Sequence, residues 1–265
     1  MRYLLKLNMS EIIDGFVGNY LIPKSRAQDH YFKRIAKSIA GKFGYSLPRS
    51  IDFLLRMGER YSLKYTFFVV GKLAGDNPGL VATLLRHGHE IASHSLTHVL
   101  AVRLTRDEFL HQLRTSKSLL EAQGAEITGY RAPHLLLNDS QYELLQEAGY
   151  AYSSSKHWSH APIAYPAPSG TVMEYPIHYQ DWNYHAEKHD TPRILETFRT
   201  AVLPGRALLL HPTFLGSPPY EALWDKVFSN PDAPRSVPLN RFLKTPEIRE
   251  QAVALTVDLG LGRWR

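Results

Sequence analysis

Short apolar runs alternate with amphipathic segments along most of the chain. Runs rich in β-branched and aromatic residues predict strands, at 3–7, 65–70, 89–93, 127–130, 150–153, 172–175 and 207–210. Helical spacing and capping residues predict helices between them, at 48–60, from Asn77-Pro78 to Gly88, from the Thr105 and Glu108 capping box to Gly124, from 138 to Gly149, and at 191–202.

This strand-helix alternation indicates parallel strands joined by crossover helices. A count of about seven strands favours an incomplete barrel over an open doubly wound sheet. The chain also has no glycine-rich dinucleotide or phosphate-loop motif, which an open nucleotide-binding sheet would carry.

The 265 residues are interpreted as one domain, 1–265, with two departures from the repeat. Residues 14–46 form an insertion, with a possible helical lid at 30–42, and residues 155–190 form a long loop region rich in aromatic residues. The tail from Val237 is expected to hold one more helix and no recognisable chemistry.

Composition restricts the chemistry. There is no cysteine, so any metal must be held by histidine and carboxylate side chains. The net charge of +6 comes from scattered Lys and Arg, which indicates a solvated surface, and a nucleic-acid partner would rest on charge alone. No apolar run approaches a membrane span and the N-terminus lacks a signal-peptide pattern, so a cytoplasmic location is expected.

Polar residues stand where the predicted strands end. In a (β/α) barrel the C-terminal strand ends meet at the functional face, and there the sequence places Asn8, His94, Arg131, Ser153 and His211. His98 follows His94 in a His-x-x-x-His pair, a spacing that lets two imidazoles reach one ion. Alone the spacing is a weak signal, because chance also produces it elsewhere in a chain with 13 histidines.

Four segments resemble motifs of the polysaccharide deacetylases, carbohydrate esterase family 4 or the NodB-homology fold. They are 65–71 (YTFFVVG), 88–98 (GHEIASHSLTH), 129–133 (GYRAP) and 208–212 (LLLHP). The resemblance implies a distorted (β/α)7 barrel that removes an N-acetyl group from an amino sugar or polysaccharide. It also implies a divalent metal, zinc first with cobalt, nickel or manganese as alternatives, held by His94 and His98.

In such enzymes a first-strand aspartate completes the metal site, a second one is the general base, the arginine orients that base and the late histidine is the acid. The resemblance therefore gives His211 the role of acid and Arg131 that of orienting residue. The expected first-strand end carries Asn8 where the base belongs. Glu11 is the leading third metal ligand and an alternative base, with Asp14 behind it as a ligand.

The family also has an aspartate that pairs with the arginine, and Ser153 stands there. Arg131 is therefore expected to lack both carboxylate partners and to contact Glu11, the substrate or an anion. His134 is a substitute base, a substrate contact or a packed loop residue. Pro133, Trp158, Trp182 and Tyr175 are substrate-binding candidates, although the aromatic rings could equally pack the long loop.

Two functions follow. The first is a metal-dependent deacetylase acting on an acetamido sugar, favoured because His94, His98, Arg131 and His211 all stand at motif positions. The second is a degenerate relative that binds a glycan or partner without turnover, favoured by Asn8 and Ser153.

Overall fold

A computed structural model of the protein describes residues 47–156, 162–180, 201–212, 218–231, 233 and 235–260. The strands are β1 (Tyr65–Val69), β2 (Glu90–Ser93), β3 (Gly129–Tyr130), β4 (Tyr152–Ser153), β5 (Ile163–Ala167), β6 (Gly170–Glu174), β7 (Ile177–Gln180), β8 (Ala207–Leu210), β9 (Arg235–Ser236) and β10 (Ala252–Leu259). The α-helices are α3 (Leu47–Arg60), α4 (Gly71–Asp76), α5 (Leu80–Arg86), α6 (Arg106–Glu121), α7 (Tyr142–Glu147), α11 (Pro218–Phe228) and α12 (Asn240–Lys244).

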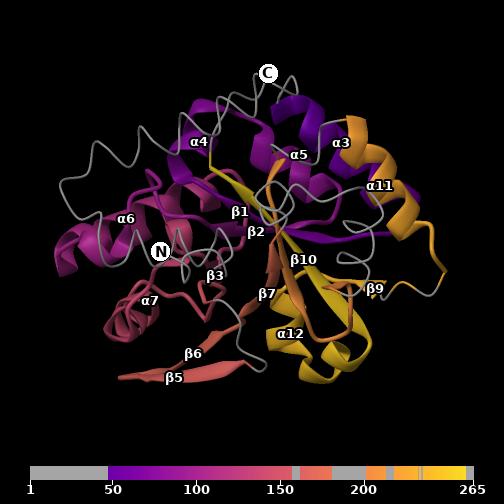
Figure 1. Ribbon diagram of the computed structural model, residues 1–265. Coiled ribbons are helices and arrows are strands. Elements are labelled where there is room, and N and C mark those ends of the chain that lie inside the picture. The colour runs from indigo at the N-terminus through magenta and orange to yellow at the C-terminus, as the bar shows by residue number, and fades with distance from the viewer. Residues whose placement is uncertain are drawn as a thin grey trace, which may run out of the picture.

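The strands form one sheet in the order β5-β6-β4-β3-β2-β1-β10-β8-β7, with β9 paired to the start of β10. Every described pairing is parallel except the β5–β6 hairpin. The yellow β10 therefore lies inside the sheet, between β1 and β8, although it is the last described strand in the chain (Figure 1). The sheet is strongly curled, and the predicted barrel-type α/β fold is confirmed.

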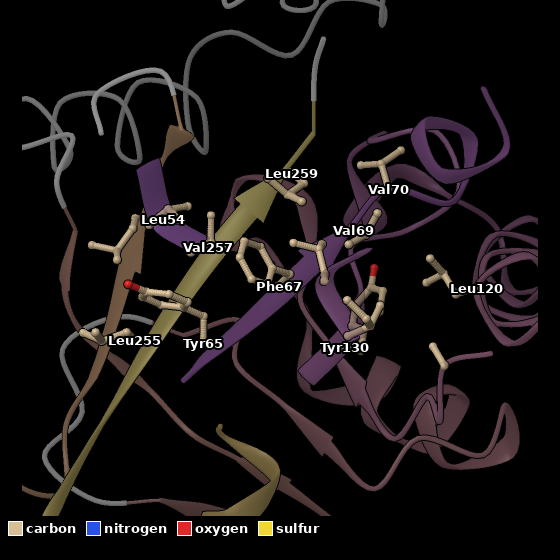
Figure 2. Close-up of a cluster of buried hydrophobic side chains, with 14 of the residues drawn as sticks. Leu54, Tyr65, Phe67, Val69, Val70, Leu120, Tyr130, Leu255, Val257 and Leu259 are labelled. Atoms are coloured by element: carbon tan, nitrogen blue, oxygen red, sulfur yellow. The ribbon is translucent and has the colours of Figure 1, made fainter. Parts of the chain in front are cut away.

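Alternation along β1 and β10 divides the core between the two faces of the sheet. Tyr65, Phe67, Leu255 and Val257 lie on one face with Leu54 of α3, as Figure 2 shows. The parallel register pairs the intervening residues, Thr66 with Thr256 and Phe68 with Asp258, which point to the opposite face. Both faces of these strands are buried, which is typical of parallel sheets and explains their continuous apolar runs.

Most predicted elements are present with shifted ends. The predicted helix beginning at Asn77 is wrong in its start. Asn77 instead follows α4, where its side-chain amide donates to the carbonyl of Leu73, and α5 begins after Gly79. The capping box predicted for α6 is confirmed, since Thr105 accepts from the backbone of Glu108 and the Glu108 carboxylate accepts from the backbone of Thr105.

Two larger predictions need correction. Residues 155–190 were expected to form a long loop around one strand at 172–175; that strand is present as β6, but the described part also contains β5 and β7. The tail from Val237 was expected to add only a helix, but after α12 it forms β10, the longest described strand. The predicted strand 3–7, the insertion 14–46 and nearly all of the helix 191–202 lie outside the described residues. Within the described residues, no helix is long and apolar enough to cross a membrane.

Candidate functional site

The candidate site begins where β2 ends, at the two histidines of the His-x-x-x-His pair. His94 follows Ser93 and is 2% exposed, and His98 is half-buried. Their ring centroids lie 4.8 Å apart in an edge-to-face arrangement. The predicted pair is therefore brought together at the C-terminal end of a buried strand.

Arg131, directly after β3, is the largest fully buried side chain among the described residues. Its Nε donates to the carbonyl of Ser154 at 2.7 Å, its Nη2 to the Ser154 hydroxyl at 2.7 Å, and its Nη1 to Thr256 Oγ1 and Asp258 Oδ1, both at 2.8 Å. The guanidinium carbon also lies 4.0 Å from the ring centroid of Phe68. Strand β10 thus holds Arg131 from one side and the segment after β4 from the other.

Arg131 was expected to contact Glu11, the substrate or an anion in place of the two family carboxylates, but its partner among the described residues is the carboxylate of Asp258. Asp258 stands near the end of β10, with 10% of its side chain exposed, and forms a buried ion pair with Arg131. Its second oxygen, Oδ2, lies 3.6 Å from His94 Nε2. Asp258 thus connects the arginine to the first histidine.

The pKa of Asp258 lies below its ordinary value. Burial raises it, but the positive charge of Arg131, which also donates a hydrogen bond to the carboxylate, outweighs the effect of burial. The carboxylate is consequently ionised at neutral pH.

The two paired histidines are held in the neutral form. Burial lowers the pKa of His94, and burial together with the neighbouring imidazoles of His94 and His134 lowers that of His98 well below the ordinary range. His94 Nδ1 lies 3.0 Å from the carbonyl of Arg131, which can only accept, so Nδ1 carries the proton. The lone pair of His94 therefore lies on Nε2, the atom that faces Asp258.

Two further histidines border the site. His211, directly after β8, is close enough for its charge to affect the pKa values of His94, His98 and Asp258. The ring of His134 lies 5.0 Å from that of His98, edge to face. The four predicted residues His94, His98, Arg131 and His211 are all brought to one end of the sheet, and His134 lies beside them.

Unusual backbone conformations concentrate at this place. Of the five non-glycine residues with positive φ in the described chain, four lie here: Ser95 (67°), His98 (58°), His134 (60°) and Leu135 (57°). A left-handed conformation is unfavourable for such residues and persists only where surrounding contacts impose it, as at functional sites.

Serines stand at 153–155, at the end of β4, where the resemblance led us to expect a carboxylate at Ser153. Ser153 itself does not touch Arg131 in the described contacts, and its hydroxyl lies 2.8 Å from that of Ser155. Ser155 accepts from the backbone N–H of Ala132, and Ser154 alone of the three holds the arginine. Arg131 therefore has one carboxylate partner among the described residues, Asp258, so the buried pair carries no net charge.

The other predicted site residues have different outcomes. Asn8, Glu11, Trp158 and Trp182 lie outside the described residues. Pro133 is buried beside His134. Tyr175, predicted as a possible sugar-stacking ring, is 5% exposed and packs edge to face on Tyr152 and Phe242, so it is a core residue.

Asp258 is the functional residue that sequence reasoning missed. The run 252–258 (AVALTVD) has the composition of a buried strand and ends in a carboxylate. His94, Arg131 and His211 were predicted because they follow the C-terminal ends of predicted strands. The same argument would have identified Asp258 if 252–258 had been predicted to form a strand.

The described residues meet only part of the requirement for a divalent metal. His94 and His98 are neutral imidazoles at close range, which is the chemistry a metal ligand needs. However, no three His, Asp or Glu side chains in the described part of the chain are arranged to hold an ion. The residue after Asp258 is Leu259, which packs in the core and offers no ligand atom.

Comparisons with known proteins agree with this geometry. The family model for polysaccharide deacetylase matches residues 35–153, which include His94, His98 and Arg131. A peptidoglycan-N-acetylglucosamine deacetylase of Bacillus cereus is 30% identical over 103 residues, 39% of this chain and 46% of that protein. A chitooligosaccharide deacetylase of Sinorhizobium fredii is 28% identical over 176 residues, 66% of this chain and 67% of that protein.

Among solved structures, that of a putative polysaccharide deacetylase from Mycobacterium smegmatis resembles this fold with a TM-score of 0.67 at 23% identity. The superposition covers 78% of this chain and 80% of that one. The chain spans less than half the length of the Bacillus cereus relative, and the family match ends before β10 begins. From the family match, the shared fold and the histidines and arginine at the strand ends, we conclude that the chain belongs to the polysaccharide deacetylase family.

Proposed function

We propose that the protein hydrolyses the N-acetyl group of an amino sugar within a glycan, releasing acetate and a free amine. The observation that carries the proposal is the Asp258 carboxylate, which is paired with Arg131 and faces His94 beside His98 and His211. The names of the relatives point to chitooligosaccharide or peptidoglycan N-acetylglucosamine as the substrates to test first.

The residues of this chain divide the proton transfers between them. Asp258 accepts the proton of the attacking water, since its carboxylate is ionised at neutral pH and has one oxygen, Oδ2, free of the arginine. Arg131 fixes the orientation of that carboxylate through Oδ1. His211 donates a proton to the sugar nitrogen as the carbon–nitrogen bond breaks, because an amine leaves only when protonated.

His94 and His98 are the residues that would hold a divalent metal, such as zinc, cobalt, nickel or manganese. The metal would supply a Lewis acid that polarises the acetyl carbonyl. Glu11 remains the proposed third ligand.

The test measures acetate released from chitooligosaccharides and peptidoglycan fragments, with each of the four metals and with a chelator. We expect metal-dependent release, reduced by about 10²–10⁴-fold in Asp258→Asn, the typical effect of losing a general base. Asp225→Asn is the matched control, because Asp225 pairs with Arg60 at the same 2.8 Å but on the surface. Absence of acetate release with every metal and both substrates would overturn the proposal.

A second candidate is a relative that binds a glycan without turnover. It is favoured by Asn8 and Ser153, which stand where the resemblance implies carboxylates, and by the lack of a third metal ligand among the described residues. Saturable binding of chitooligosaccharides without acetate release would support this candidate over the enzyme.

A further inference from the structure

Three residues, Ser95, Leu96 and Thr97, connect His94 to His98. Ser95 has a φ of 67° and His98 a φ of 58°, so the chain enters and leaves this segment in left-handed conformations. Such conformations need support from outside the segment, because non-glycine residues do not favour them.

A single side chain of α6 provides much of that support. Gln112 Oε1 accepts from Ser95 Oγ at 3.0 Å, from the backbone N–H of Leu96 at 3.2 Å, and from both the backbone N–H and the hydroxyl of Thr97 at 3.1 Å. Backbone N–H groups can only donate, so these contacts fix the oxygen of the amide toward the segment. One half-buried oxygen thus receives every contact that the segment makes with Gln112.

The other side of the segment is held by backbone groups. The N–H of Gly71 donates to the carbonyl of Ser95 and that of Lys72 to the carbonyl of Leu96, each at 2.9 Å. Ser116, one turn after Gln112 on α6, also donates to the Ser95 carbonyl at 3.0 Å. Segment 95–97 is therefore clamped between the start of α4 and one face of α6.

The two helices that hold segment 95–97, α4 and α6, are closely packed against each other at Gly71 and Ser116. A Cβ atom added at Gly71 would lie 3.0 Å from Ser116 Cα, so α4 and α6 are already in close contact there. The acceptor that holds the N–H groups of Leu96 and Thr97 thus lies on a helix that is packed closely against α4. Loss of the Gln112 oxygen would leave the backbone N–H groups of Leu96 and Thr97 to hydrogen-bond with water, and residues 95–97 could then change conformation.

We propose that Gln112 is a positioning residue that sets the spacing of His94 and His98 and thereby the affinity of the pair for a divalent metal. The inference rests on the proposed function, since it assumes that the two histidines bind a metal. Groups that orient metal ligands without touching the metal contribute about 10–100-fold in affinity when removed.

The experiment compares Gln112→Leu, Gln112→Glu and Gln123→Leu in the full chain, measuring the Kd for Zn²⁺ by calorimetry and amide hydrogen exchange at Leu96 and Thr97 without metal. Leucine keeps the bulk of Gln112 but has no acceptor, while glutamate keeps the Oε oxygen. Gln123 is the control, because its amide donates to the Ala74 carbonyl, 3.0 Å away, and does not touch the segment.

We expect zinc to bind about 10–100-fold more weakly to Gln112→Leu, with faster exchange at both amides. Affinity and protection should be close to those of the unsubstituted protein in Gln112→Glu and Gln123→Leu. Rescue by glutamate separates a positioning role from a general loss of folding.

Two results would overturn the inference, and they can be told apart. If the unsubstituted protein binds zinc more tightly than His94→Ala, and Gln112→Leu binds it equally well, then Gln112 does not position the pair. If the unsubstituted protein binds no more zinc than His94→Ala, the metal site of the proposed function fails as well.

Discussion

The buried ion pair of Arg131 and Asp258 allows a direct test of how this site is held together. We consider Asp258→Asn, which keeps the shape of the side chain and an oxygen that can accept from Nη1, but removes the charge. Arg131 is fully buried, so its guanidinium would remain in the protein interior without an anionic partner. Leaving a buried charge uncompensated is among the most destabilising consequences of a single substitution.

The expected cost follows from burial. Removing one partner of a buried pair typically costs about 3–5 kcal/mol. Arg131 keeps its contacts to Ser154 and to Thr256 Oγ1, and asparagine keeps an acceptor, so we expect the lower end, about 3 kcal/mol in the free energy of unfolding. Asp225→Asn removes an equally short ion pair whose side chains are 64% and 40% exposed, for which about 0.2–1 kcal/mol is typical.

The assay is urea unfolding followed by tryptophan fluorescence and circular dichroism, with the free energy extrapolated to water. The reasoning would be refuted if Asp258→Asn cost no more than Asp225→Asn. A double substitution, Asp258→Leu with Arg131→Met, removes both charges. It should recover much of the loss, because replacing a whole buried pair by apolar residues is often close to neutral.

Three further substitutions test other parts of the structure. Burial, followed by the neighbouring Lys64 and His87, lowers the pKa of His89 from 6.5 to about 3, so the unfolded chain takes up the proton first. The free energy of unfolding should therefore decrease as the pH is lowered from about 6.5 to 3, by up to about 1.4 kcal/mol for each pH unit. His89→Phe should remove this part of the pH dependence, as measured by unfolding at a series of pH values. Thr105→Ala removes the N-cap of α6 and should cost about 1 kcal/mol in chemical unfolding. Gly129→Ala places a methyl group into the ring of the buried Tyr152 and should destabilise by about 1–3 kcal/mol or more, seen as a lower midpoint of thermal unfolding.

Much of the fold could be predicted from local pattern. The run 65–70 is continuously apolar because β1 is buried on both faces, and the spacing in 48–60 is that of α3, which packs Leu54 on the same core. His94, Arg131 and His211 could also be predicted, since each directly follows a strand, and His98 follows from its spacing to His94. These features depend on a few neighbouring residues, which is the range that periodicity and capping can reach.

What could not be predicted depends on which strands become neighbours. Asp258 meets Arg131 across 127 residues of chain, and no local pattern reports such a contact. The same holds for Ser154, which contacts the arginine although Ser153 was predicted at the family position. The one-residue difference arises because successive side chains of a strand point to opposite faces.

The position of β10 also changes what can be inferred about the carboxylates of this site. Strand β1 pairs with β2 and β10, and β8 pairs with β7 and β10, so both edges of β1 and of β8 are taken by described strands. The place between β1 and β8 is therefore filled by the strand that carries Asp258. Because all of these strands are parallel, their C-terminal ends meet at one edge whatever their order in the chain, and a carboxylate from the last strand reaches His94 as directly as one from the first.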